Sequence, residues 1–266
     1  GSGMSHVDIW AGENLSYEDE RITWAMTPAE LIMEDEHRPF GSLACVLVEN
    51  DGALEEQLYP VKGPEDSEFI RGPVPMTKSE VRRLSLEKLR IGHGAVCYDI
   101  GAGTGSVAVE MGQEIRRRGG NGEVYAIERS LDALQLIQSN CQKFHGGWQG
   151  FHIVEGGAPE AMEGLPLPTH AFIGGSGGKM QAIVEALVAA NPGVRIVANA
   201  ITLETLGEIL DCMRNFGFQD TELTQIWAAK VETAGAYHMP KAQNPVYIAV
   251  MQNPSLDSEE IQWQEL

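Results

Sequence analysis

The chain has few cysteines and lacks any long apolar run. It contains four cysteines in 266 residues, and none of them forms a CxxC pair. Such spacing is typical of reduced thiols rather than of a disulfide framework or a zinc site. No stretch of about 18 uncharged apolar residues is present, and the start lacks a basic segment followed by an apolar one. We therefore predict no metal site, no membrane span and no signal peptide, and we expect a cytoplasmic protein.

Basic residues are also scarce. The 19 lysines and arginines stand against 38 acidic residues, which gives a formal net charge of −19. A strongly acidic protein repels nucleic acid and anionic membranes. The excess lies in the flanks, because residues 1–72 hold 16 acidic and four basic side chains. We therefore expect neither nucleic acid nor a membrane as a partner, whereas the near-neutral middle can still present cations to an acidic substrate.

The composition changes along the chain and suggests several segments. Residues 51–72 mix acidic residues with prolines and show no periodicity, which predicts a linker. Before it, two short strands at 6–13 and 41–50 are expected to flank a helix at 27–36, in a β-α-β arrangement. About fifty residues are few for an independent core. After a three-residue cloning scar, we interpret 1–50 as the remnant of an upstream domain, 73–252 as the main domain and 253–266 as an acidic tail.

Helices and apolar strands alternate after residue 72. The expected strands are 95–101, 123–128, 151–156, 170–175 and 194–200, and the expected helices are 77–89, 104–118, 131–144, 180–190 and 203–216. Strands that are apolar throughout and alternate with helices imply a parallel sheet covered on both faces. Two more strands, at 221–231 and 245–251, have no helix between them. We therefore predict an α/β fold with a Rossmann-like, doubly wound sheet and an antiparallel C-terminal strand.

A glycine-rich turn follows the first of these strands. The string YDIGAGTGS places Gly101, Gly103 and Gly105 where the strand passes into its helix, with Ala102 and Thr104 between them. Glycines there let the backbone approach a ligand. The dinucleotide fingerprint GxGxxG would require its third glycine at position 106, where this chain has Ser106. The pattern here is GxGxG instead. An ordinary strand-to-helix turn is the alternative interpretation.

A second acidic signal favours a ligand. Glu128 ends the next apolar strand, where a carboxylate can accept hydrogen bonds from both hydroxyls of a ribose. A solvated strand-end glutamate is the alternative. The loop and this carboxylate together indicate an adenosine-type cofactor without a pyrophosphate. This pattern is typical of class I methyltransferases that use S-adenosylmethionine (SAM).

Several strings, in order, resemble one family of methyltransferases. They are PMTKSEVR, DIGAGTGSV, VYAIER, EGGAPEAM, FIGGSGGKM, VANAITLETL and NPVYI, between residues 73 and 252. The family is that of the precorrin methyltransferases of cobalamin biosynthesis, which methylate carbon 15 and decarboxylate the ring C acetate. ENLSYEDERIT and FGSLACVLVEN look similar to the end of the methylase that acts on carbon 5, which is often fused upstream. Because only its last part is present, we expect no carbon-5 activity here.

The resemblance implies a SAM site, a precorrin or cobalt-precorrin substrate and a homotetramer. The implied cofactor contacts are Thr77, Gly101, Ala102, Gly103, Thr104, Gly105, Glu128, Gly157 and Ala158. Gly157 departs from the family, which more often has glutamate before Ala-Pro, and this weakens the assignment on the adenine side. Thr77 has an alternative role, because Thr77 and Glu80 fit a capping box for the helix at 77–89.

The substrate implied by the resemblance carries many carboxylates, so its pocket should offer donors and positive charge. The string GGSGG follows the fourth strand, and we infer close approach of the tetrapyrrole to Gly174, Gly175, Gly177 and Gly178, with Ser176 meeting its carboxylates. A flexible connection is the alternative. Candidate cations are Lys78, Arg82, Arg129, Lys179 and Lys230, each of which could equally be a solvated surface charge.

Catalysis requires the reacting carbon to be aligned with the methyl donor, and no protein nucleophile is needed. Asn199 and Ser176 are the predicted catalytic residues. Asn199 could hold the reacting ring edge, or it could cap the next helix. Decarboxylation also requires a proton donor, for which His238 is the best histidine candidate, although an exposed loop histidine is the alternative. Two other functions remain open: a methyltransferase acting on RNA or protein, and a noncatalytic SAM-binding scaffold subunit.

Overall fold

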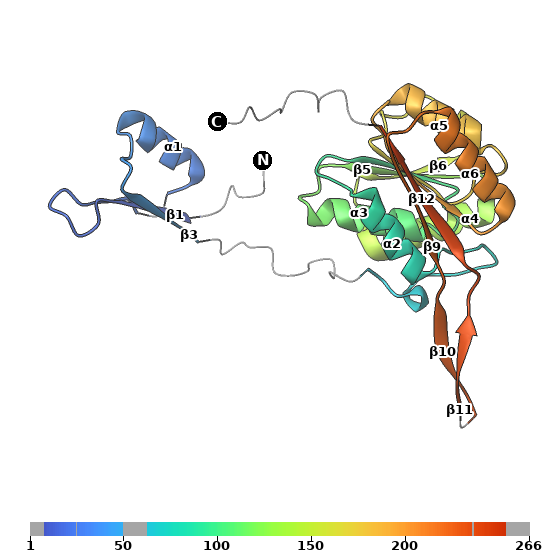
Figure 1. The fold of residues 1–266 in the computed structure, drawn as a ribbon. Helices are drawn as coiled ribbons and strands as arrows, with labels where there is room; N and C mark the ends of the chain where they lie inside the picture. The colour runs from blue at the N-terminus through green and yellow to red at the C-terminus, as the bar shows by residue number, and fades with distance from the viewer. Residues whose placement is uncertain (1–7, 25, 50–62, 236, 254–266) are drawn as a thin grey trace. The chain divides into compact units, whose positions relative to one another are not determined.

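The computed structural model describes residues 8–24, 26–49, 63–235 and 237–253, which form two separate units (Figure 1). The described residues up to 49 belong to the first unit, and those from 63 onward belong to the second. Residues 1–3, the first half of the expected linker and nearly all of the expected acidic tail lie outside the described residues. No helix in the described ranges is long and apolar enough to cross a membrane.

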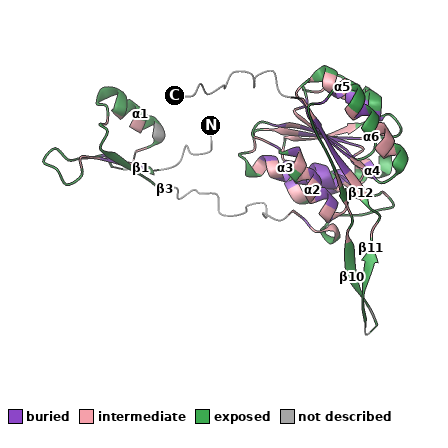
Figure 2. Cartoon of the chain, viewed as in Figure 1, coloured by how far each residue is buried: buried purple, intermediate pink, exposed green. Residues whose placement is uncertain are grey.

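The first unit is a three-stranded sheet with one helix. Its strands are β1 (Asp8–Glu13), β2 (Arg21–Ile22) and β3 (Ala44–Glu49), in the order β2-β1-β3, and all pairs are antiparallel. The helix α1 (Pro28–His37) begins with the capping box that Thr27 forms with Glu30. The expected strand-helix-strand order is confirmed, with antiparallel pairing and one additional short strand. Every residue of β3 is exposed (Figure 2).

The second unit is built on a seven-stranded sheet of order β6-β5-β4-β7-β8-β12-β9. Its parallel strands are β4 (Val96–Ile100), β5 (Glu123–Glu128), β6 (Phe151–Glu155), β7 (His170–Ile173) and β8 (Arg195–Ala200). The strand β12 (Val246–Gln252) runs antiparallel to both β8 and β9 (Asp220–Ile226). The doubly wound sheet with an antiparallel C-terminal strand is therefore confirmed.

Helices cover both faces of this sheet because its strands are apolar on both sides. Along β5, Val124 and Ala126 face one core cluster, whereas Tyr125 and Ile127 face the other. The first cluster includes residues of α2 (Ser79–Leu89), α3 (Ser106–Arg117) and α4 (Leu131–His145). The second includes residues of α5 (Met180–Ala190) and α6 (Leu203–Asn215). The period-two alternation of a strand thus produces the two layers.

Two local predictions are wrong. Residues 63–72, expected to be part of a linker, pack onto the second unit: they contain the short 3-10 helix η1 (Asp66–Glu68), and Phe69 is only 4% exposed. The backbone N–H and C=O of Ile70 both bond to the Asn140 side chain.

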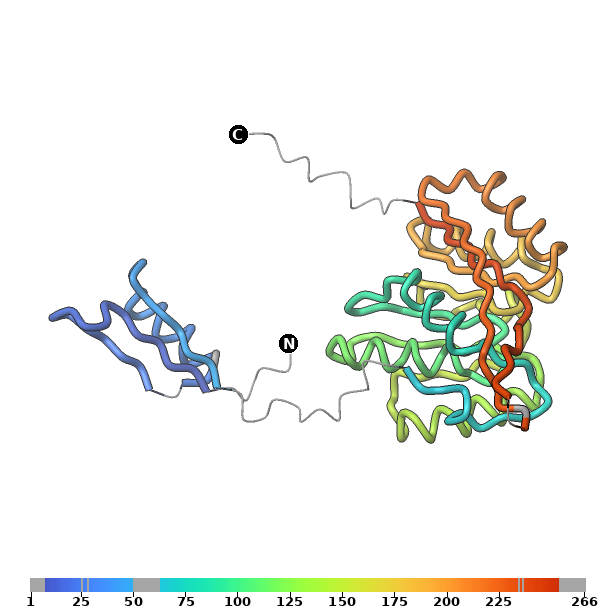
Figure 3. Tube along the Cα trace, turned by 60° about the horizontal axis from the view of Figure 1, so that its bottom comes forward, coloured from blue at the N-terminus to red at the C-terminus, as the bar shows by residue number. Residues whose placement is uncertain are grey.

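In addition, the expected strand at 221–231 is interrupted after Ile226, and the hairpin of β10 (Ala229–Ala234) and β11 (Tyr237–Ala242) follows (Figure 3). A second 3-10 helix, η2 (Glu160–Met162), follows β6.

Candidate active site

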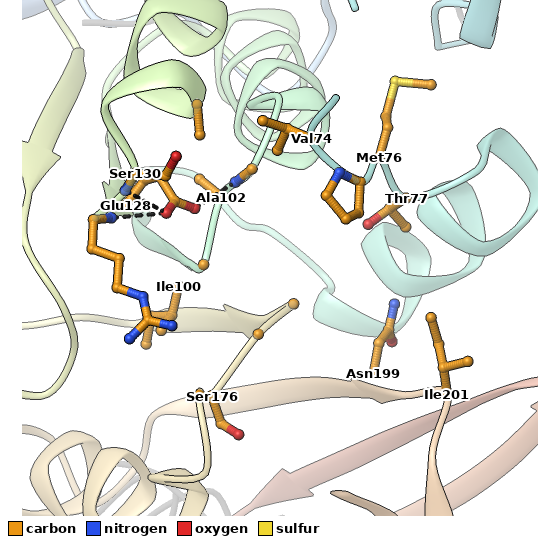
Figure 4. Close-up of a pocket in the computed structure, with 18 of the residues that line it drawn as sticks. Val74, Met76, Thr77, Ile100, Ala102, Glu128, Ser130, Ser176, Asn199 and Ile201 are labelled. Carbon is orange, nitrogen blue, oxygen red and sulfur yellow. Dashed lines mark hydrogen bonds between the residues drawn. The ribbon is translucent and has the colours of Figure 1, made fainter. Parts of the chain in front are cut away.

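A cavity of about 1040 Å³ opens at the carboxyl ends of the parallel strands (Figure 4). It lies where strand order reverses between β4 and β7, the usual ligand position in doubly wound sheets. Of the predicted site residues, the cavity is lined by Thr77, Lys78, Gly101, Ala102, Gly103, Glu128, Gly157, Ala158, Gly174, Gly175, Ser176, Gly177, Gly178, Lys179 and Asn199. This volume lies at the upper end of the roughly 300–1,000 Å³ found for small-molecule sites, so the cavity is large enough for a nucleoside cofactor.

The first glycine loop has backbone conformations that favour glycine. Gly101 and Gly103 have φ values of +71° and +57°. A Cβ added to Gly101 would lie 2.6 Å from the carbonyl oxygen of Gly175, and one added to Gly103 would lie 3.0 Å from that of Pro75. The loop therefore has to be glycine-rich both for its conformation and for its contacts with other backbone segments.

Two predicted cofactor contacts lie behind this loop. Thr104 is 1% exposed, and its Oγ1 has no hydrogen-bond partner in the described part of the chain. Gly105 donates its N–H to Ala102, and an added Cβ would pack against Ile137. Neither residue lines the cavity, because the chain has already turned inward to begin α3. The prediction that both contact the cofactor is therefore not supported by their placement.

The Glu128 carboxylate is held at the cavity by backbone N–H groups. Its Oε2 accepts from Gly103 at 3.0 Å, and its Oε1 accepts from Arg129 at 2.8 Å and from Ser130 at 3.0 Å (Figure 4). These bonds fix the carboxylate against the first glycine loop. Since a carboxylate offers about four acceptor positions, three N–H bonds leave capacity for a ligand hydroxyl. The side chain is thus oriented before any ligand arrives.

A buried acid supports the same loop from below. Asp99 is 1% exposed, and its Oδ2 accepts from the N–H of Ala108 in α3 at 2.9 Å. Its Oδ1 has no partner among the described residues. Burial, together with the negative charge of Glu128, raises the pKa of Asp99 to about 7, although the N–H of Ala108 acts in the opposite direction. Asp99 therefore joins β4 to α3 beneath the loop and does not line the cavity.

The second glycine loop faces the first across the cavity floor. The N–H groups of Gly174 and Gly175 both donate to the carbonyl of Ile100, which ties this loop to β4. The Ser176 Oγ accepts from the N–H of Gly178 at 3.3 Å and lies toward the open space in Figure 4. A Cβ added to Gly175 would meet no atom within 4 Å. This loop therefore leaves open volume beside the first one.

Asn199 lies near the end of β8 and points into the cavity (Figure 4). The Ser85 hydroxyl donates to Val81 at 2.8 Å, which leaves its oxygen to accept from the Asn199 Nδ2 at 3.2 Å. The alternative role of Asn199 as a helix cap is wrong, because Thr202 caps α6 by accepting from the N–H of Thr205. Ser85 was not predicted, since nothing in the sequence relates it to a strand 114 residues away.

The helix α2 begins later than expected. Its N-cap is Lys78, which forms no side-chain cap bond, so the predicted capping box of Thr77 with Glu80 is wrong. Instead, the Glu80 carboxylate pairs with Lys230 at 3.0 Å. The carbonyl of Thr77 accepts from the Arg82 guanidinium at 2.6 Å. Thr77 is therefore free of the cap and lines the cavity.

Arg82, a candidate substrate contact, has a structural role instead. Its side chain is fully buried, pairs with Glu110 and lies 3.1 Å from Asp66. It also donates to the carbonyl of Pro64 and lies over the ring of Phe69. A guanidinium with this many partners holds 64–69 and Thr77 in place. It does not line the cavity.

Two other predicted residues are also placed differently. His238 is exposed on β11 and does not line the cavity, which removes the reason for choosing it as the proton donor. Lys179 lines the cavity, but its ammonium bonds to Glu160 at 2.8 Å. Lining residues that the sequence did not suggest include Val74, Gln243 and Asn244. The last two lie just before β12, and their position at the cavity depends on the antiparallel return of that strand.

Comparison with known proteins identifies the family. Residues 70–253 match the family described as the precorrin methyltransferase domain. The chain belongs to this family. A protein of Pyrobaculum calidifontis, named probable cobalt-precorrin-6B C(15)-methyltransferase (decarboxylating), is 40% identical over 191 residues, which cover 71% of this chain and 95% of that protein.

Solved structures agree. A precorrin-6y C5,15-methyltransferase of Geobacter metallireducens is 36% identical, with a TM-score of 0.66 over 73% of this chain and 100% of that one. A precorrin 8W decarboxylase of Methanobacterium thermoautotrophicum is 35% identical, with a TM-score of 0.64 over 71% and 98% of the two chains. A SAM-dependent O-methyltransferase of Thermotoga maritima, 15% identical, shares the fold, with a TM-score of 0.54 over 93% of each chain.

The residues present fit a SAM molecule. The first glycine loop lines the cavity, and Glu128 presents an oriented acceptor beside it. Apolar side chains of Ile100, Ile127 and Ala133 line the same part of the cavity. A flat base and a ribose require these three features: apolar walls, close backbone approach and a carboxylate acceptor.

Proposed function

We propose that this protein methylates carbon 15 of a precorrin-type tetrapyrrole and decarboxylates its ring C acetate, as a step of cobalamin biosynthesis. One observation carries the proposal: in a member of the precorrin methyltransferase family, both glycine loops and Glu128 line a single cavity. The names of the Pyrobaculum and Geobacter relatives agree with this activity.

The proposed cofactor is SAM, which supplies an electrophilic methyl group when bound. In this arrangement, Glu128 accepts from the ribose, and the backbone of Gly101 to Gly103 lies against the cofactor. Thr77, Gly157 and Ala158 complete the proposed contacts, since all three line the same cavity. Orientation of the reacting carbon is the main catalytic contribution of the protein, because positioning alone can supply several kcal/mol of the roughly 7 to 11 available.

The proposed tetrapyrrole position is the open space beside the second glycine loop. All five residues of this loop line the cavity, and a Cβ added to Gly175 or Gly178 would meet nothing within 4 Å. Asn199 faces the same space and is held by Ser85, so that it can orient the ring edge that reacts. The conjugated macrocycle accepts the electron pair released when CO₂ leaves, and a proton must follow at that carbon.

The first unit has a separate proposed origin. The strings that resemble the end of the carbon-5 methylase span residues 13–23, which include β2, and residues 40–50, which include β3. Exposed apolar residues such as Leu43, Val46 and Leu47 agree with a fragment whose own core is incomplete. We propose that this unit is the last part of such a domain and that it contributes nothing to the carbon-15 reaction.

Incubation with SAM and a precorrin extract, followed by mass spectrometry, tests the proposal. We expect a product that has gained one methyl group and lost one CO₂. Transfer of labelled methyl to RNA or protein instead would support the other enzyme class. SAM binding without turnover of any of these substrates would support a noncatalytic scaffold subunit and would contradict the proposal.

A further inference from the structure

The cations that the sequence places near the substrate fall into two groups. Arg82, Lys179 and Lys230 each pair with a carboxylate of the chain: Arg82 with Glu110 and Asp66, Lys179 with Glu160 at 2.8 Å, and Lys230 with Glu80 at 3.0 Å. Such a cation is largely neutralised before a ligand arrives. A ligand carboxylate would have to displace a partner of the chain in order to use it.

Lys78 and Arg129 form the other group. Both line the cavity. Within the ranges that the structure describes, the Lys78 ammonium and the Arg129 guanidinium have no hydrogen bond or ion pair. Lys78 is also half-buried at the N-cap of α2. A cation that lines the cavity without a counterion from the chain can pair with a ligand anion without first losing a partner. In a chain of net charge −19, this arrangement indicates an anionic ligand.

The acidic groups that line the cavity do not neutralise these two cations. Glu128 accepts from three backbone N–H groups on the side of the first loop. Asp132 lies in the first turn of α4 and is exposed. Neither carboxylate forms an ion pair with Lys78 or Arg129 in the described part of the chain. Both cations therefore remain available at the cavity.

The residues that directly precede the two cations in the chain lie on different sides of the cavity. Figure 4 shows Thr77, next to Lys78, across the open space from Glu128, next to Arg129. The Arg129 guanidinium lies beside the second glycine loop, because a Cβ added to Gly177 would be 3.8 Å from its Nη1. A flat ring with carboxylates on its rim could thus contact both cations while its faces lie against the loops.

We infer that Lys78 and Arg129 are the specificity-determining residues that bind two peripheral carboxylates of the tetrapyrrole from opposite sides. The inference rests on the proposed function and adds which cations recognise the substrate. Arg129 offers a planar fork that can bind a carboxylate through two parallel hydrogen bonds, whereas Lys78 offers a single point charge. Together they fix the rotation of the ring in its plane, and so they select which bridging carbon faces the methyl donor.

The test compares Lys78→Gln and Arg129→Gln with two controls that remove the same charges elsewhere. The controls are Lys241→Gln and Arg118→Gln, whose side chains are exposed, pair with Glu232 and Glu114, and lie outside the cavity lining. We expect each cavity variant to raise the KM for the tetrapyrrole about tenfold, with SAM affinity unchanged. The double variant should raise it about a hundredfold if the two sites act independently.

Charge-conserving variants separate recognition from folding. Lys78→Arg should keep most of the affinity, and Arg129→Lys should lose part of it, because a lysine cannot bind a carboxylate through two donors. A melting temperature measured for each variant identifies any loss of fold. An unchanged KM in both glutamine variants, or equal losses in the two controls, would overturn the inference.

A second readout does not depend on turnover. Binding of a porphyrin with carboxylate side chains can be followed by its fluorescence, beside the same porphyrin with its carboxylates esterified. We expect the wild type to prefer the free acid about tenfold or more and the double variant to lose this preference. If the wild type prefers the free acid but transfers no methyl group to a precorrin, the proposed function is contradicted and the inferred carboxylate binding by Lys78 and Arg129 is retained. If the wild type methylates a precorrin but shows no preference for the free acid, only the inference about Lys78 and Arg129 is contradicted.

Discussion

The two glycine loops of the cavity contain glycine for different physical reasons. In the first loop, Gly101 has a φ of +71°, and an added Cβ would lie 2.6 Å from the backbone oxygen of Gly175. In the second loop, an added Cβ at Gly175 would meet nothing within 4 Å. The first loop is therefore glycine-rich because the protein already fills the space around it. In the second loop, space remains unfilled at Gly175, as expected where a ligand enters, whereas Gly177 and Gly178 have positive φ like the glycines of the first loop.

The two glycine loops also differ in how hydrogen bonds hold them. The first loop is tied to Glu128 through the N–H of Gly103, and Asp99 anchors the helix that follows it. The tip of the second loop is held by the weaker bond from Gly178 to Ser176, at 3.3 Å. A preorganised loop suits a cofactor of constant shape, whereas a more open loop suits a large substrate. The comparison agrees with the proposed position of the cofactor at the first loop and of the tetrapyrrole at the second.

Replacement of Gly101 by alanine should have the largest effect. The new Cβ would meet the Gly175 backbone at a φ that alanine disfavours, so one of the loops must move. We expect the free energy of unfolding to fall by about 2–4 kcal/mol and SAM affinity to fall at least about a hundredfold. Urea unfolding and calorimetry measure the two effects. Gly92→Ala is the matched control, because its Cβ would meet nothing within 4 Å; equal behaviour of both variants would remove the distinction between the loops.

Replacement of Glu128 by alanine should have an intermediate effect. The ribose acceptor is lost while the strand remains intact, so we expect SAM affinity to fall at least about tenfold with the fold retained. Glu155→Ala provides the control, since this glutamate is the register partner of Glu128 on β6, is exposed and does not line the cavity. Calorimetry showing the same SAM affinity for the Glu128 variant as for the wild type would remove the ribose assignment.

Replacement of Gly175 by valine should change stability least. The side chain would enter open volume, so we expect the free energy of unfolding to stay within about 0.5 kcal/mol and SAM affinity within about threefold. The KM for the tetrapyrrole should rise severalfold, because the added methyl groups occupy its proposed space. Steady-state kinetics with each substrate varied in turn would show this split. Loss of SAM affinity would instead place the second loop in the cofactor site.

Much of the second unit was predictable because its signals are local. Apolar strands alternating with amphipathic helices predicted the doubly wound sheet, and the helix α5 begins and ends at the expected residues, Met180 and Ala190. The glycine pattern before α3 and the terminal position of Glu128 on β5 placed both at the carboxyl edge of the sheet. These predictions depend on side-chain periodicity and on the order of helices and strands, both of which can be read from the sequence without the tertiary structure.

The failures share a different cause. The helix α2 begins after Thr77 because Arg82, buried among Glu110 and Asp66, takes the Thr77 carbonyl as a hydrogen-bond acceptor. The same network orders residues that composition alone assigns to a linker. The hairpin after Ile226 was also not predicted as a separate element, because its first strand follows β9 after only two residues.

The amino-acid sequence by itself determined the layers of this protein, the edge of the sheet that carries the site, and the two loops that surround it. These features follow from side-chain periodicity and from where glycine replaces larger residues. Only the tertiary structure decided which charged groups remain available there. The pairing of Arg82, Lys179 and Lys230 with carboxylates, and the absence of such partners for Lys78 and Arg129 among the described residues, depend on contacts between distant segments. No spacing along the chain encodes such contacts, because an ion pair forms through distance in space.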